Sequence, residues 1–251
     1  MAVTLAYKSD IGRNPKRKNE DYIWVNEAMD LYIVADGMGG QEAGEVASEM
    51  AATTIADHIS RDLGALTDPP SAETIAQIMS SAIEVANEAV SKAAQAAEQR
   101  RKMGATIVVA LLHNAKAYIS HAGDARAYLV RGGTIMQLTR DDSWSAELEA
   151  EGVITRDQAE NHPFGHIVTK AIGQGSDLAP SFAEFNLTPG DWLLLCSDGL
   201  WNMLSDEEIL TIIKTADGQP EQAVEALVAA ANEAGGKDNI SVVALKMAAE
   251  T

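Results

Sequence analysis

Five aspartates stand where an apolar segment of the chain meets a polar loop, and this repetition limits the possible folds more than any other feature of the sequence. They are Asp21, Asp36, Asp124, Asp198 and Asp238. Asp36, for example, ends the apolar run LYIVA and is followed by four glycines within eight residues. Any one of these acids alone is accounted for as a turn residue. As a set, they predict a fold in which several strand ends meet at one edge.

Carboxylates that converge in this way need cations. Two of them at 4 Å repel by about 4 kcal/mol at an effective dielectric constant near 20, so four together would exceed the stability of a typical domain. Ligation by oxygen alone favours Mg²⁺ or Mn²⁺ over zinc. Two such ions, about 3.5 to 4 Å apart, can hold a phosphoryl group and convert a bridging water to hydroxide. We therefore predict a metal site for phosphate chemistry.

The composition fits one domain and disfavours several classes of function. The 251 residues are 46% apolar, enough to bury a core, and no apolar run approaches the length of a membrane span. The N-terminal residues lack the pattern of a signal peptide and Cys196 is the only cysteine, so we expect a cytoplasmic protein without disulfides. A formal charge of -18 disfavours nucleic acid and anionic membranes as partners. We expect a monomer.

The first half of the chain predicts a hairpin followed by two helices. Residues 22–25 and 31–35 are typical of strands, and the polar turn NEAMD between them predicts a hairpin. Residues 43–63 place an apolar side chain at every fourth position, which indicates a helix. A second helical pattern at residues 75–93 follows Ser71, a suitable N-cap. The two helices should form an antiparallel pair.

The second half is rich in β-branched segments. Residues 105–139 alternate such segments with turns and predict an antiparallel meander. Two short helices follow, the second begun by the capping-box spacing of Thr155 and Gln158. The remaining predicted elements are a strand at 192–196, helices after Ser205 and at 219–234, and a strand at 240–247. Together these elements predict an α+β fold, a four-layer α-β-β-α sandwich in which helix pairs flank two packed antiparallel sheets.

One dense basic stretch precedes Asp21. Arg13, Lys16, Arg17 and Lys18 fall within six residues. Two interpretations stay open: a solvated loop, or side chains that attract an anionic substrate to an otherwise acidic protein.

Five segments of the sequence resemble one enzyme family. RKNED, VADGMGGQEAGEVAS, GDAR, LCSDGLW and KDNIS occur in the order found in the metal-dependent protein phosphatases, also called type 2C, and the likeness spans essentially the whole chain. The sequence is most similar to the short bacterial branch. The resemblance implies the same α-β-β-α sandwich and hydrolysis of phosphoserine and phosphothreonine in proteins with Mn²⁺ or Mg²⁺. It also implies that the substrates are those of a serine/threonine kinase.

The resemblance also implies roles for individual residues. Asp36 would bridge two metal ions and Gly37 would offer its carbonyl oxygen to one of them. Asp198 and Asp238 would be further ligands. Asp21 would act close to the ions, directly or through bound water.

A third, weaker metal site and a flap are implied as well. Asp124 matches the acid that bacterial members use together with the residue at 198 for a third ion. Residues 141–175 resemble the flap that lies beside the substrate in this family. The chain would then be a single catalytic domain, 1–251, with a flap subdomain.

The sequence departs from the family pattern at two places. Lys16 stands where family members usually place a phosphate-binding arginine, and the segment from Gly12 is one residue longer. Arg13, Lys16 and Arg17 are all candidates for this role; we favour Arg17 because a guanidinium can hold phosphate through two bonds. Met38 stands where many eukaryotic members have a histidine that protonates the leaving oxygen. A metal-bound water would have to supply that proton.

A second hypothesis is a phosphoprotein-binding module without catalysis. The chain keeps every acid of the family motifs, whereas a degenerate site usually loses ligands, so we favour the enzyme. Turnover that depends on Mn²⁺ distinguishes the two.

Overall fold

The computed structural model describes residues 2–14, 18–40, 42–96, 103–160, 162–165, 167–175 and 178–248, and this part of the chain contains two five-stranded antiparallel sheets. The first sheet has the order β2(Asp21–Asn26), β3(Leu31–Met38), β4(Gly104–His113), β5(Lys116–Ala122), β8(Ser181–Asn186). The second sheet has the order β1(Val3–Asp10), β10(Ile240–Met247), β9(Trp192–Cys196), β6(Arg126–Arg131), β7(Thr134–Gln137).

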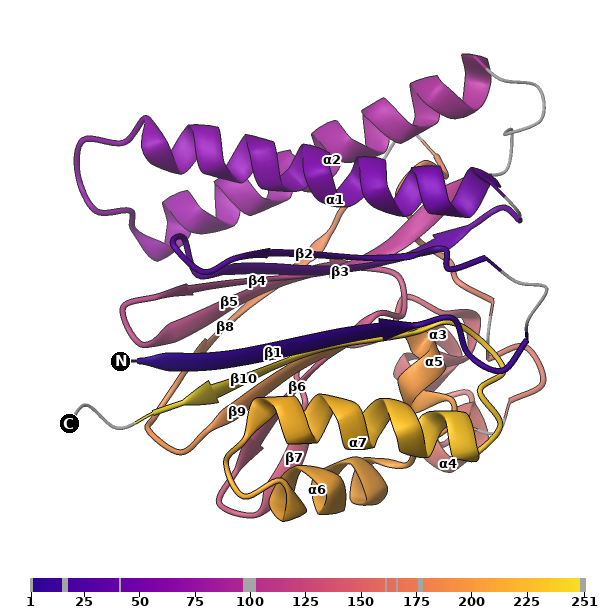
Figure 1. Ribbon diagram of the computed structural model, residues 1–251. Helices are drawn as coiled ribbons and strands as arrows, with labels where there is room; N and C mark the ends of the chain where they lie inside the picture. The colour runs from indigo at the N-terminus through magenta and orange to yellow at the C-terminus, as the bar shows by residue number, and fades with distance from the viewer. Residues whose placement is uncertain are drawn as a thin grey trace.

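Helices cover the outer faces of both sheets. The helices of the described residues are α1(Glu42–Gly64), α2(Ala72–Ala96), α3(Trp144–Ala150), α4(Arg156–Glu160), α5(Asp198–Trp201), α6(Asp206–Thr215) and α7(Pro220–Glu233), and the four longest of them form the outer layers. The pair α1 and α2 lies over the first sheet, and α6 and α7 lie over the second (Figure 1). The predicted four-layer α-β-β-α sandwich is confirmed.

Alternation along β3 shows how the strands divide their side chains between two apolar layers. Leu31 and Ile33 pack against α1 and α2, whereas Tyr32 and Val34 pack between the sheets. A separate apolar layer joins the second sheet to α6 and α7. The inner strands β3, β4 and β9 lie between two apolar layers and are buried on both faces, which explains their continuous apolar runs.

Local sequence rules account for the helix boundaries. The Ser71 hydroxyl accepts a hydrogen bond from the main-chain N–H of Thr74 at 3.1 Å, so it caps α2 as predicted. Ser205 and Glu208 form the capping box of α6. The hairpin of β2 and β3 and the antiparallel pair of α1 and α2 are also as predicted.

The meander predicted for residues 105–139 is wrong. The hairpin β4–β5 belongs to the first sheet, but β6–β7 belongs to the second, so the chain crosses between the sheets after Ala122. Gly123 makes this crossing possible because its φ is 106° and a Cβ there would lie 2.5 Å from the Cβ of Thr106. The apolar alternation of β4–β5 and of β6–β7 is the same whether the two hairpins share one sheet or lie in two. Periodicity alone therefore could not distinguish a single meander from two separate hairpins.

Two strands were not predicted at all. β1 pairs with β10 at one edge of the second sheet, and β8 pairs with β5 at one edge of the first. In the described residues, no helix has the length and apolar character needed to cross a membrane.

Candidate metal centre

Alternation along β2 and β3 carries two of the predicted ligands to the end of the layer between the sheets. Tyr32 and Val34 point toward the second sheet, so Asp36, two residues further on, points the same way. Asp21 lies directly opposite Asp36 in the register of the two strands. The two acids are therefore neighbours where the apolar layer ends.

The second sheet brings two more acids to the same edge. Asp198 begins α5 just after β9, and Asp238 lies just before β10, the antiparallel neighbour of β9. Gly199 lets these two segments touch, because a Cβ at this position would lie 1.9 Å from the carbonyl oxygen of Asn239. Only glycine fits after Asp198 without moving the backbone.

Hydrogen bonds join the two sheets at this edge. The Ser197 hydroxyl donates to Asp21 Oδ2 at 2.7 Å, linking the end of β9 to the start of β2. The main-chain N–H of Glu20 donates to Asn239 Oδ1 at 2.8 Å, and Asn239 Nδ2 donates to the carbonyl oxygen of Ile11 at 3.0 Å. Asn239 is buried. It therefore ties together three segments that are distant in sequence.

The carboxylates at this edge affect each other's protonation. Burial, followed by the charges of Asp21, Asp198, Asp124 and Asp238, raises the pKa of Asp36 well above its usual range. Burial raises the pKa of Asp21 to about 7, and two of the same acids add to the rise. The four other predicted acids thus all lie within electrostatic reach of Asp36.

Asp124 lies in the crossing between β5 and β6, where its side chain is buried. Burial, followed by the charge of Asp198, raises its pKa to about 8. The indole N–H of Trp201 donates to the main-chain oxygen of Asp124 at 3.1 Å. Arg126 stacks over the Trp201 ring at 3.7 Å and donates hydrogen bonds of 2.9, 3.3 and 2.7 Å to the Asp141 carboxylate. These contacts hold the Asp124 loop against α5.

The donor set can be tested for its fit to divalent cations. Asp21 Oδ1 is buried, and no hydrogen-bond partner for it is found among the described residues, so a cation would compensate a group that is otherwise costly to bury. At Gly37 a Cβ would lie 2.1 Å from the carbonyl oxygen of Gly44, so the backbone here is close-packed and free of side chains. Carboxylate and carbonyl oxygens suit Mg²⁺ or Mn²⁺. The residues fit such ions in chemistry.

Their arrangement is less complete than their chemistry. Within the described ranges, no three or more His, Cys, Asp or Glu side chains are grouped as a metal site requires. The acids share one edge of the sandwich but do not close around a point.

The candidates for phosphate binding are only partly located. The main-chain N–H of Arg13 donates to the carbonyl oxygen of Gly236 at 2.8 Å, and Gly236 lies two residues before Asp238 in the sequence. The backbone of Arg13 therefore contacts the loop that carries Asp238, and its side chain is exposed. Lys16 and Arg17 lie outside the described residues. Met38 ends β3 on the face that carries Asp36.

The predicted flap is fastened at its base to the loop that carries Asp124. Asp142 Oδ2 accepts a hydrogen bond from the main-chain N–H of Gly123 at 3.1 Å. Its Oδ1 forms an ion pair with Lys170 at 2.7 Å, near the other end of the flap. Asp142 and Lys170, near the two ends of the predicted flap, are therefore held together beside Gly123, the residue that precedes Asp124 in the sequence.

Several residues of this edge were not predicted. Ser197 and Asn239 could have been found, because each directly adjoins a predicted acid and has a side chain that donates and accepts hydrogen bonds. The ion pair of Arg126 and Asp141 could not, because it depends on how the chain crosses between the sheets.

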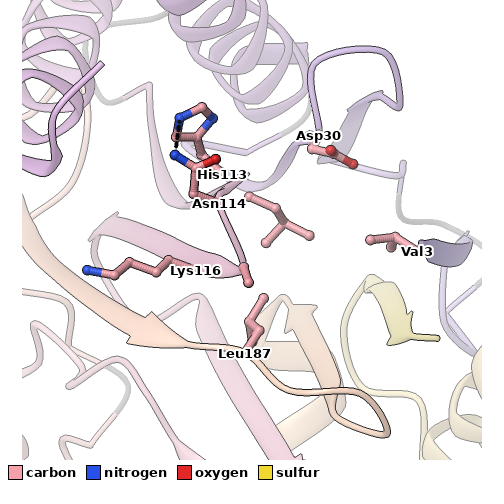
Figure 2. Close-up of a pocket in the computed structure, with 8 residues that line it drawn as sticks. Val3, Asp30, His113, Asn114, Lys116 and Leu187 are labelled. Atoms are coloured by element: carbon pink, nitrogen blue, oxygen red, sulfur yellow. Dashed lines mark hydrogen bonds between the residues drawn. The ribbon is translucent and has the colours of Figure 1, made fainter. Parts of the chain in front are cut away.

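Two hollows lie outside the carboxylate edge. One, of about 240 Å³, is at the opposite end of the sandwich, between Val3, Asp30 and the turn of β4 and β5 (Figure 2). His113 and Asn114 hydrogen-bond to each other there at 3.0 Å. Asp30 precedes β3 whereas Asp36 lies near its far end, so this hollow is remote from the acids. The second, of about 800 Å³, lies beside α2 and Gly173.

Known proteins resemble this chain along its length. The family model for protein phosphatase 2C matches residues 14–240. The protein phosphatase PhpP of Streptococcus pneumoniae is 39% identical over 245 residues, which are 95% of each chain. A solved serine/threonine phosphatase of S. agalactiae is 33% identical with a TM-score of 0.88, covering 98% of this chain and 100% of the other. The catalytic domain of PstP, solved with two manganese ions, is 30% identical with a TM-score of 0.83, covering 98% and 99%.

Proposed function

The chain belongs to the protein phosphatase 2C family and is a protein serine/threonine phosphatase; from this premise we propose that it hydrolyses phosphoserine and phosphothreonine at a pair of Mn²⁺ or Mg²⁺ ions. The acids of the carboxylate edge would hold these ions, with Asp36 between them. The manganese-bound PstP domain supports two ions. The choice between Mn²⁺ and Mg²⁺ is part of the proposal.

Each residue of the edge has a role in this proposal. Gly37, through its carbonyl oxygen, Asp198 and Asp238 would complete the ligands of the two ions, and Asp124 would share a third, weaker ion with Asp198. Asp21 would act directly or through water. When bound, the ions would neutralise the acids, polarise the phosphoryl group and lower the pKa of water enough for hydroxide to attack phosphorus.

The protein's own residues would prepare that chemistry. Ser197 holds the Asp21 carboxylate through a 2.7 Å hydrogen bond, which fixes the direction of the remaining oxygen. A basic side chain of the loop at 13–17 would hold the substrate phosphate, and we favour Arg17 over Arg13 and Lys16. Met38 carries no exchangeable proton, so the leaving oxygen would take its proton from water.

The observation that carries the proposal is the electrostatic position of Asp36. This acid shares a buried edge with four others and its pKa is raised by all of them. Such a group is stable as a carboxylate only beside cations. Five acids from five separate segments repel one another at one edge, whereas a site for divalent ions needs them.

The surroundings of the site form the rest of the proposal. We propose a single catalytic domain over residues 1–251 with the flap at 141–175. The substrates would be proteins phosphorylated by a serine/threonine kinase, and the enzyme would act as a cytoplasmic monomer.

A turnover assay with metal control tests the proposal. With p-nitrophenyl phosphate and a phosphothreonine peptide, we expect turnover that needs Mn²⁺ or Mg²⁺ and stops with EDTA. Asp36→Asn and Asp238→Asn should lose most turnover, while Asp57→Asn, on the exposed face of α1, should not. Asp124→Ala should slow turnover while calorimetry still detects two metal ions.

Three results would count against it. Near-normal rates in both Asn variants would refute the ligand assignment. Loss of all metal binding in Asp124→Ala would contradict its separate site. Tight binding of the phosphopeptide without turnover would favour the binding module.

A further inference from the structure

Gln174 lies beside the carboxylate edge although no sequence motif points to it. The segment 171–174 lies beside the start of β4, where Ala105 and Ile172 exchange two main-chain hydrogen bonds of 3.0 and 2.9 Å. On the same side of β4, the pairing with β5 begins only at Ile107, two residues after Ala105. The segment therefore extends the first sheet past the end of β5, toward Asp36.

The Gln174 side chain reaches across β4 to β3. Its Nε2 donates to Met38 Sδ at 3.2 Å. It passes over Gly104, where a Cβ would lie 3.3 Å from its Cγ. Met38 shares a face with Asp36, about 7 Å further along the strand. The amide of Gln174 thus stands on the side of the sheet where the phosphorylated residue would be held.

Asn87 fixes the position of Gln174. This asparagine is buried in the middle of α2, where it accepts a hydrogen bond from the main-chain N–H of Gly173 at 2.7 Å. It also donates to the carbonyl oxygen of Gly175 at 3.0 Å. Both neighbours of Gln174 are held, while its own side chain is exposed. Its hydrogen bond to Met38 is weak, since a thioether is a poor acceptor.

The hollow of about 800 Å³ begins where Asn87 contacts Gly173 and Gly175. Gly173, Gly175 and Asn87 line it together with the next two turns of α2, which contribute Ser91 and Gln95. Its lining mixes polar and apolar groups, because Glu88, Lys92 and Ala94 stand beside the main-chain, amide and hydroxyl groups. Such a lining suits an extended polypeptide, whose main chain offers a donor and an acceptor at each residue.

We propose that Gln174 and the hollow beside α2 bind the polypeptide that flanks the phosphorylated residue of the substrate. The Gln174 amide would exchange the Met38 sulfur for a main-chain carbonyl oxygen of the substrate, a stronger acceptor. The flanking residues would continue into the hollow along Ser91 and Gln95. This inference rests on the proposed function, because it needs a phosphoprotein at the carboxylate edge.

Comparison of two substrates tests the inference. The variants are Gln174→Leu, which removes the donor, and Gln95→Trp, which narrows the hollow; Gln77→Leu and Gln77→Trp, at an exposed position near the other end of α2, are the matched controls. For each, kcat and KM are measured with Mn²⁺ on p-nitrophenyl phosphate and on a phosphothreonine peptide of about ten residues. Equal urea midpoints check folding.

We expect kcat/KM on the peptide to fall about tenfold relative to kcat/KM on p-nitrophenyl phosphate in Gln174→Leu, mainly through KM, as for the loss of one hydrogen bond. Gln95→Trp should shift the same ratio, and the controls should not. An unchanged ratio in both variants, or an equal fall on both substrates, would overturn the inference while the proposed function stands. Absence of metal-dependent turnover in the unmodified protein would overturn the proposed function and this inference with it.

Discussion

Gly199 offers the sharpest test of how the site is built. In Gly199→Ala the new Cβ would lie 1.9 Å from the carbonyl oxygen of Asn239, and the two must separate by about 1.1 Å to reach the 3.0 Å that real contacts require. Neither atom belongs to a flexible side chain, so the backbone of α5 or of the segment before β10 has to move. Asp198 and Asp238 lie on these two segments, and their spacing changes with that movement.

The expected effects follow from this displacement. A shift of about 1 Å in a catalytic group costs about 100-fold in rate. Overpacking of this kind costs about 1 to 3 kcal/mol in the free energy of unfolding. We therefore expect Gly199→Ala to fold, to be moderately destabilised in urea, and to lose about 100-fold in Mn²⁺-dependent turnover of p-nitrophenyl phosphate. Calorimetry should show weaker binding of Mn²⁺.

Gly64→Ala is the matched control. Gly64 ends α1, and no atom of the described residues lies within 4 Å of the position that its Cβ would take. This variant should keep its turnover and its metal affinity. If Gly199→Ala matched Gly64→Ala in turnover, metal affinity and urea midpoint, the reasoning that the two loops set the spacing of the acids would be refuted.

Two further predictions concern charge. In EDTA, the free energy of unfolding should fall as the pH rises from about 4 to 8: Asp21 and Asp124, with folded pKa values of about 7 and about 8, keep protons that the unfolded chain releases above its usual pKa near 4. Urea midpoints across this range measure the trend, and a midpoint that rises with pH contradicts it. Arg126→Met should cost about 3 kcal/mol in urea because the mostly buried Asp141 carboxylate loses its charged partner and keeps only the hydrogen bond from Gln137. Lys92→Met, which breaks an exposed pair with Glu88, should cost nothing measurable; equal losses would refute the argument.

Local rules in the sequence were sufficient for most elements of the fold but not for their assignment to sheets. The Ser71 cap, the capping box of Ser205 and Glu208 and the apolar helix stripes depend only on neighbours within a few residues. The crossing at Gly123 depends on a close approach to Thr106, a residue of β4, which no pattern in the crossing itself reveals. β8 was missed because it is a short edge strand whose two faces both mix apolar and polar residues, so the sequence shows no regular alternation.

The site could be predicted to a different extent. The five acids were found because a carboxylate at the end of a buried strand is conspicuous in the sequence, and the structure brings all five to one edge. Their precise roles stay predictions, and Lys16 and Arg17 fall outside the described residues. The contacts of Asn87 with Gly173 and Gly175 join α2 to a segment about 86 residues later, so only the folded chain shows them.

The edge where Ser197 and Asn239 bind across the sandwich also carries the charges that repel each other. The hydrogen bonds that join the two sheets and the acids proposed for catalysis therefore lie at the same edge. An engineer who sought a hardier protein by replacing one of those acids with its amide would gain folding energy and lose the enzyme. Stabilising substitutions are better placed on the outer helices, away from the carboxylate edge.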